Sequence, residues 1–211
     1  MYSVRAQRFD RLYELAESQQ GFFSASQARE LGYSRQLQAY HVGAGDWLKR
    51  GRGILRLKHF PPANKPDGFY MTYLWALNRE GEPEGVFGFG SALYIHELST
   101  YVPPGFDLVV PKHFRRHSKP PATIFLHKKM LDAQDVQRIA GLPVTRPLKT
   151  IIDLLDTKVI DHDYVLDALK SAIDRLMITK RQLRQAQLTS AQRARLKDAL
   201  ARINYKSIDE I

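Results

Sequence analysis

Side chains that suit contacts with nucleic acid gather in one short stretch, residues 34–58. Six cationic residues in this stretch stand against a single acid, Asp46, which gives it a net charge of +5. Arg and Gln form bidentate hydrogen bonds with base edges in the major groove of DNA, whereas Lys and Arg bind phosphates. The residues that we expect to contact DNA are Ser34, Arg35, Gln36, Gln38, Ala39, Lys49, Arg50 and Arg52.

The positions of these side chains depend on two short helices. Ser24 is suited to cap a first helix over residues 25–31, and Ser34 is suited to cap a second one. In the second helix the spacing of Leu37, Tyr40 and His41 predicts a buried side. The same spacing leaves Arg35, Gln36, Gln38 and Ala39 on the outer side, where they could reach DNA.

Residues 47–57 predict two short strands joined by a basic turn that contains glycine. Ahead of the two helices, the spacing of Phe9, Leu12, Tyr13 and Ala16 predicts another helix that ends near Gly21. Three helices followed by a basic hairpin form a winged helix-turn-helix, whose second helix enters the major groove. An alternative is a small α+β protein-contact domain whose basic turn is only solvated.

A second, larger domain is expected after a linker rich in Pro and Gly, residues 60–68, so that the domains span 1–60 and 69–211. The apolar spacing predicts helices over 69–78 and 90–98, and a pair of strands over 107–111 and 123–127. Residues 141–147 read as an extended connector, and the remainder as helices, one of them capped by Ser190. The expected fold class is therefore α+β, with a mixed α/β second domain that has a helical C-terminal end.

The second domain carries further positive charge. Residues 112–119 form a basic loop without an acid, and the stretch 175–206 has a net charge of +8. These charges can bind phosphate or can simply be solvated. The residues of this candidate second basic surface are Lys112, Arg115, Arg116, Lys119, Lys180, Arg181 and Arg184.

The composition narrows the classes of protein. The 211 residues have a net charge of +10 and contain no cysteine, which excludes disulfides, thiol catalysis and cysteine-ligated zinc fingers. Neither a signal peptide nor a membrane-length apolar run is evident. We therefore expect a cytoplasmic protein with an acidic partner.

Enzymatic alternatives are weakly supported. Asp107 and Lys112 resemble part of a metal-dependent nuclease site, but no second acid occurs over residues 106–130. His113 and His117 are surrounded by cations that would repel a metal ion. The glycines at 85, 88 and 90 lack the Lys-Ser or Lys-Thr of a nucleotide-binding loop. We therefore expect no enzyme activity, no metal and no cofactor.

Three groups of residues together resemble the AbiE-type antitoxins of type IV toxin-antitoxin and abortive-infection (phage-defence) pairs. The first group is the second helix and wing, from Ser34-Arg35 to Arg52-Gly53. The others are Ser91-Ala92-Leu93 with His96-Glu97-Leu98, and Gly141-Leu142-Pro143-Val144-Thr145 with Leu148-Lys149-Thr150-Ile151-Ile152-Asp153-Leu154.

This resemblance implies a two-part protein. Its N-terminal domain would bind operator DNA, expected to contain inverted repeats, and repress its own operon through Arg35, Gln36, Gln38, Lys49, Arg50 and Arg52. Its C-terminal domain would neutralise a nucleotidyltransferase-like toxin without a stable complex between the two proteins. A stand-alone winged-helix regulator with a sensory second domain remains the alternative.

Overall fold

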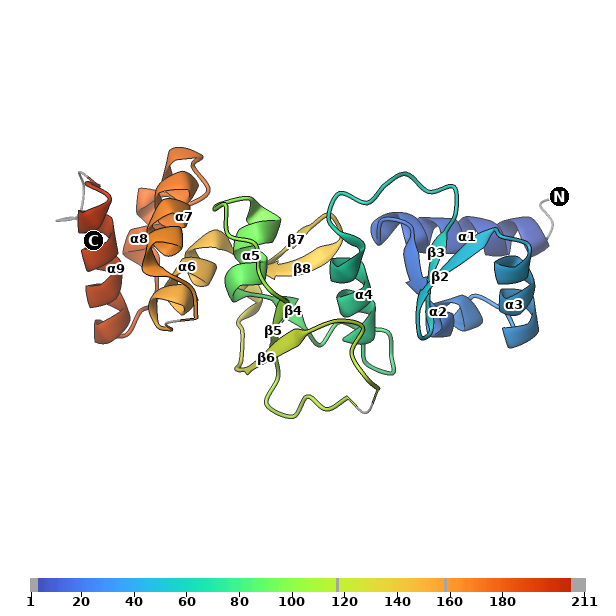
Figure 1. Ribbon diagram of the computed structural model, residues 1–211. Helices are drawn as coiled ribbons and strands as arrows, with labels where there is room; N and C mark the ends of the chain where they lie inside the picture. The colour runs from blue at the N-terminus through green and yellow to red at the C-terminus, as the bar shows by residue number, and fades with distance from the viewer. Residues whose placement is uncertain (1–3, 117, 158, 206–211) are drawn as a thin grey trace. The chain divides into compact units, whose positions relative to one another are not determined.

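The computed structural model describes residues 4–116, 118–157 and 159–205 (Figure 1). The chain divides into two compact units, each built from more than one stretch. The first unit consists of residues up to 86 together with 110–124 and 138–143, and the second consists of the remainder. None of the helices in the described part of the chain combines the length and apolar character needed to span a bilayer.

The first unit begins with the predicted winged helix-turn-helix. Its elements are α1 (Val4–Ser18), β1 (Phe22–Ser24), α2 (Ala25–Glu30), α3 (Arg35–Gly43), β2 (Trp47–Gly51) and β3 (Ile54–Leu57). The strands form an antiparallel sheet in the order β1-β3-β2, with Phe22 opposite Arg56 and Trp47 opposite Leu57. The prediction of a three-helix core followed by a two-stranded wing is confirmed, and β1 is a third strand that the sequence did not reveal.

Both predicted helix caps are present. The Ser24 hydroxyl accepts a hydrogen bond from the Gln27 backbone N–H, and the Gln27 side-chain oxygen accepts one from the Ser24 backbone N–H, which completes a capping box. The Ser34 hydroxyl accepts from the backbone N–H of Leu37 at 3.2 Å. These caps fix where α2 and α3 begin.

The core of the winged helix lies between its helices and its sheet. Phe23 packs edge-on against Trp47, with the two ring centroids 4.9 Å apart. The other buried members of this cluster are Leu12, Ala16, Ala28, Tyr33, Leu55 and Leu57. A further helix, α4 (Asp67–Trp75), packs on this same unit because its Tyr70 ring stacks on Phe22 at 5.2 Å.

A second sheet contains five strands in the order β6-β5-β4-β8-β7. Its strands are β4 (Val86–Phe87), β5 (Phe106–Val110), β6 (Ile124–Lys128), β7 (Val136–Ile139) and β8 (Leu142–Thr145). The predicted strands near 107–111 and 123–127 are confirmed as the neighbours β5 and β6. Helix α5 (Phe89–His96) follows β4, and the 3-10 turn η1 (Ala133–Asp135) precedes β7.

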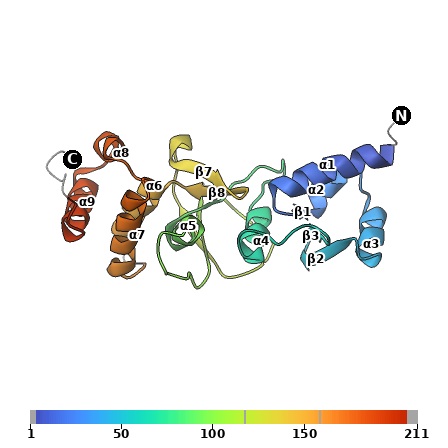
Figure 2. The same cartoon turned by 90° about the horizontal axis from the view of Figure 1, so that it is seen from above.

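The described part of the second unit ends in four helices, where the sequence predicted a helical end without defining each of them. They are α6 (Pro147–Leu155), α7 (His162–Asp174), α8 (Lys180–Gln185) and α9 (Ser190–Arg202), and Figure 2 shows them from above. Their core includes Ile151, Leu169, Leu196 and Leu200, each of which is fully buried. The fold class is therefore α+β, as expected, whereas the division at residues 60–68 stays a prediction.

Two local predictions were wrong. The expected connector over 141–147 contains strand β8, whose four residues are all buried. The expected cap of the last helix, Ser190, is its first helical residue, and Thr189 is the cap. The Thr189 hydroxyl accepts from the Gln192 backbone N–H at 3.2 Å while the Gln192 side chain accepts from the Thr189 backbone, so the capping box begins one residue earlier.

Candidate nucleic-acid interface

The outward face of α3 carries three of the residues that we expected to contact DNA. Arg35, Gln36 and Ala39 are exposed, and the Ser34 cap next to them is exposed too. At 3.6 residues per turn these side chains share one side of the helix. Leu37 and Val42 pack against the core of the winged helix.

Gln38 does not belong to this face, contrary to the sequence prediction. Its side chain is buried, and its amide nitrogen donates to the carbonyl oxygens of Tyr33 at 2.8 Å and Ala25 at 3.1 Å. A buried amide is tolerated where its polar atoms find partners, as they do here. Gln38 therefore joins α3 to α2 and to the turn between them.

Tyr40 is exposed on α3, whereas the sequence predicted that Gln38 and not Tyr40 would be exposed there. We expected Tyr40 to lie on the buried side with Leu37 and His41, but its side chain is 63% exposed. At 100° per residue, Tyr40 falls on the outward arc beyond Gln36. Its hydroxyl and ring can add a polar or stacking contact at the edge of this exposed face.

The wing presents the other predicted cations. Lys49, Arg50 and Arg52 are all exposed, and the pairing of β2 with β3 shifts register between Lys49 and Gly51. This β-bulge places Arg50 in the irregular segment, where it forms an ion pair of 3.2 Å with Asp67 at the start of α4. Arg52 and Gly53 form the turn, and the φ of +70° at Gly53 suits glycine.

Arg56 contributes to the charge of this region but not to its surface. It is 6% exposed, and its guanidinium donates to the backbone carbonyls of Phe60 and Pro61 while lying over the Phe22 ring at 5.3 Å. Arg56, one of the six cations of residues 34–58, thus binds the backbone of the segment that follows β3. A strand with one exposed face would expose every second residue, but all four residues of β3 are buried. The sequence therefore did not predict that Arg56 is buried.

The basic loop over residues 112–119 is anchored to α4. Arg116 donates hydrogen bonds to the carbonyls of Trp75 and Leu77, and the Trp75 indole donates to the carbonyl of Ser118 at 3.1 Å. Phe114 is buried beside Trp75. Arg116 therefore holds this loop in place, while Lys112, Arg115 and Lys119 are exposed; His117 lies outside the described residues.

The other predicted cations of the second basic surface belong to the second unit. Lys180, Arg181 and Arg184 are exposed on α8, and Arg181 donates to the side chain of Gln185 at 3.2 Å. Lys206, which the sequence counted in the same basic stretch, lies outside the described residues. The seven cations proposed as one surface are thus divided between the two units.

Asp107, the residue considered for a nuclease site, is engaged in internal contacts. Its carboxylate lies 2.8 Å from Nε2 of His127 and accepts from the Ser91 backbone N–H at 3.3 Å, at the first turn of α5. Ser91 Oγ in turn accepts from the Asp107 backbone at 2.8 Å. These bonds hold the Asp107 carboxylate at the N-terminal end of α5, where a carboxylate is stabilised.

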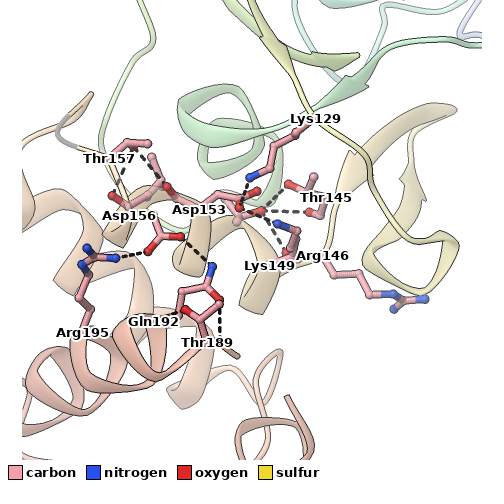
Figure 3. A network of polar contacts seen from close by, with 12 residues as sticks. Lys129, Thr145, Arg146, Lys149, Asp153, Asp156, Thr157, Thr189, Gln192 and Arg195 are labelled. Carbon is pink, nitrogen blue, oxygen red and sulfur yellow. Dashed lines mark hydrogen bonds and ion pairs between the residues drawn. The ribbon is translucent and has the colours of Figure 1, made fainter. Parts of the chain in front are cut away.

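A polar network that the sequence did not reveal surrounds α6 (Figure 3). Asp153 is 1% exposed, and its Oδ1 lies 2.6 Å from the ammonium groups of both Lys129 and Lys149. At the end of the same helix, Asp156 pairs with Arg195 at 2.6 Å and accepts from Gln192 at 2.7 Å, which joins α6 to α9. The network connects secondary-structure elements within the second unit.

Comparison with known proteins bears on the winged helix. Residues 10–58 match the family described as "Transcriptional regulator, AbiEi antitoxin". No curated protein matches the chain. The matched stretch includes α2, α3 and the whole wing, and its description as a regulator fits the expectation that the chain is not an enzyme. The winged helix-turn-helix of this chain is therefore similar to that of the AbiEi antitoxin transcriptional regulators, as the sequence resemblance predicted.

Proposed function

We propose that the protein is a sequence-specific DNA-binding autorepressor in which α3 enters the major groove. The observation that carries this proposal is the exposed arc of α3, where Arg35 and Gln36 stand beside the small residue Ala39. Arg and Gln read base edges, and Ala39 leaves room for the helix to approach the bases. Tyr40 borders this arc, and Gln38 has no direct role because its amide is bound inside the fold.

The wing supplies phosphate contacts in this proposal. Arg52 is exposed at the turn, and Lys49 is exposed on β2. Arg50 is bound to Asp67, but both partners of that pair are about two-fifths exposed. An exposed ion pair contributes about 0–1 kcal/mol, so a DNA phosphate can replace Asp67 as the partner of Arg50.

The proposed DNA binding is tested with the chain's own upstream DNA. Binding to this DNA and to an unrelated duplex of equal length is titrated at several salt concentrations. A repressor binds the upstream DNA more tightly, by at least about 10³-fold at physiological salt, and protects an inverted repeat from cleavage. Equal and steeply salt-dependent binding to both duplexes contradicts the proposal, because it describes a general polyanion binder.

We further propose that the chain is the antitoxin of a toxin-antitoxin pair and neutralises a nucleotidyltransferase-like toxin encoded beside it. Two observations support this proposal. The matched family consists of antitoxin transcriptional regulators, and the chain has a second compact unit in addition to the one that contains the winged helix. No stable complex between the two proteins is assumed. A stand-alone regulator would bind DNA through the same face of α3 and would lack only the antitoxin role.

Co-expression separates these two roles. The neighbouring gene and this chain are expressed from foreign promoters, with either the wild-type chain or the Arg35→Ala/Arg52→Ala variant. If the chain is an antitoxin, the wild type restores growth and the variant does so equally, because repression no longer matters. If the neighbouring gene is harmless, or its toxicity persists with the wild-type chain, the stand-alone regulator is the better account.

A further inference from the structure

An open groove lies beside α3 in the winged helix and reaches the proposed DNA face at Tyr40. Its volume is about 920 Å³, and its lining comes from α1, α3, the start of β2 and the segment after β3. Small-molecule sites typically have volumes of about 300–1,000 Å³ and are mostly apolar. The aromatic residues that line this groove are Phe9, Tyr13, Tyr33, Tyr40, Trp47 and Phe60.

Three of these rings are unusually exposed for their size. Phe9, Tyr13 and Tyr40 are 51%, 41% and 63% exposed. Phe9, Tyr13 and Phe60 form a series of rings, since the centroid of Tyr13 lies 6.2 Å from that of Phe9 and 5.9 Å from that of Phe60. A cluster of exposed aromatic rings in a concave site indicates a surface that binds something apolar and planar.

The polar part of the groove is cationic. Arg5, Arg8, Lys58 and His59 line it, and the acid that lines it, Asp46, is bound to Nδ1 of His41 at 2.9 Å. The His41 ring in turn stacks on Trp47 at 4.8 Å. The groove therefore offers an aromatic floor with an excess of positive charge, which suits an anion that carries an aromatic ring.

Arg8 has an unused donor in this groove. Its guanidinium lies over the Tyr33 ring at 4.7 Å, and its Nη1 donates to the carbonyl of Gly32 at 3.1 Å. Its Nε is buried and has no hydrogen-bond partner among the residues that the structure describes. The Arg8 guanidinium therefore contributes positive charge to the groove, where its contacts are with the Tyr33 ring and a backbone carbonyl.

We propose that this groove binds a small planar aromatic carboxylate, with its ring on Tyr13 and its neighbours and its carboxylate beside Arg8 and Lys58. Because Leu37, Tyr40 and His41 of α3 also line the groove, the ligand touches the helix that carries Arg35 and Gln36. The proposal concerns the groove alone, and it holds whether or not α3 binds DNA.

The test uses 1-naphthoate as the probe, titrated into the full chain by calorimetry and by amide chemical-shift mapping. Two compounds serve as controls, namely 1-naphthalenemethanol, which lacks the charge, and cyclohexanecarboxylate, which lacks the aromatic ring. The expected result is saturable binding of one naphthoate, with shifts in residues 5–13 and 58–60 and at least tenfold weaker binding of each control. Binding of the neutral alcohol with equal affinity, or no saturable binding, overturns the proposal.

Two pairs of variants locate the site. Tyr13→Ala is expected to weaken naphthoate binding at least fivefold, whereas Tyr164→Ala, which removes a tyrosine of similar exposure from α7, leaves it unchanged. Lys58→Gln is expected to weaken binding about threefold, and Lys180→Gln on α8 is its matched control. Circular dichroism confirms that each variant is folded. If naphthoate binds the Tyr13→Ala variant as tightly as the wild type, the groove is not the site.

Discussion

The helices α3 and α6 differ in where they place their polar side chains. In α3, Arg35 and Gln36 are exposed at the start of the helix. In α6, Thr150 is fully buried and Asp153 is 1% exposed. Residues from both helices carry the resemblance to the AbiE-type antitoxins, yet Arg35 and Gln36 are exposed whereas Thr150 and Asp153 are buried.

The buried side chains of α6 bind elements of their own unit. The hydroxyl oxygens of Thr150 and Thr145 lie 2.7 Å apart, and Nε2 of His96 lies 2.8 Å from the carbonyl oxygen of Thr145. Oδ1 of Asp153 forms ion pairs with the ammonium groups of two lysines, Lys129 and Lys149. Residues that carry the same resemblance therefore lie on an exposed surface in α3 and inside the fold in α6, where they stabilise the second unit.

Replacing Asp153 by alanine tests the second half of this comparison and is expected to have the largest effect. Removing one partner of a buried ion pair is strongly destabilising, and since both lysines keep some access to water we expect a loss of about 3 kcal/mol in the free energy of unfolding. Urea denaturation measures this loss.

The matched control for this variant is Asp198→Ala, which removes an exposed pair with Arg202 within α9. Its effect should be below about 0.5 kcal/mol. Equal effects of the two variants would show that the network around α6 does not stabilise the second unit.

Replacing Arg35 by alanine tests the first half of the comparison. Because Arg35 is exposed, we expect the free energy of unfolding to remain unchanged while binding to the upstream DNA weakens by about 1–3 kcal/mol, with relaxed preference at one base pair. Gel-shift titration with a set of single-base operator variants measures both. Arg79→Ala, which removes an exposed arginine from the turn after α4, should bind as the wild type does.

Replacing Lys49 by alanine distinguishes phosphate contacts from base contacts. The variant should bind every DNA sequence more weakly and to the same degree, and the slope of log affinity against log salt should fall by about 1. A loss confined to the upstream DNA would mean that Lys49 reads a base instead.

Replacing Thr189 by alanine tests the corrected start of α9. Loss of a helix cap costs about 1 kcal/mol, so this variant should unfold at a lower urea concentration. Ser190→Ala should have little effect, because Thr189 and not Ser190 accepts the bond from Gln192. The reverse order of the two variants would support the cap that the sequence suggested.

The winged helix could be predicted from the sequence because its signals are local. Ser24 and Ser34 are caps that act on residues three positions away, and the glycines around the wing end its strands. The exposed cations Lys49 and Arg52 followed from the same pattern. These features need no knowledge of distant contacts.

The faces of α3 could be predicted only in part, because residue polarity misled at two positions. From its polarity Gln38 was expected at the surface, and from its ring Tyr40 was expected in the core. In the structure the carbonyl oxygens of Tyr33 and Ala25 accept hydrogen bonds from the Gln38 side-chain amide, which is therefore buried. Strand β8 escaped prediction because Gly141 and Pro143 read as a loop. Gly141 is needed there, since its φ is +82° and a Cβ atom would lie 2.1 Å from the Ser18 carbonyl oxygen.

The most direct test of the account compares Gln36→Ala with Gln38→Ala, two identical substitutions two residues apart on α3. Each variant is measured twice, once by urea unfolding and once by binding to the upstream DNA under conditions where it is folded. The account predicts that Gln36→Ala weakens DNA binding without affecting unfolding. It also predicts that Gln38→Ala lowers the free energy of unfolding by about 1–2 kcal/mol and binds DNA as the wild type does once folded. The opposite pattern, with Gln38→Ala losing DNA binding and Gln36→Ala losing none, would contradict the assignment of the DNA-facing side of α3.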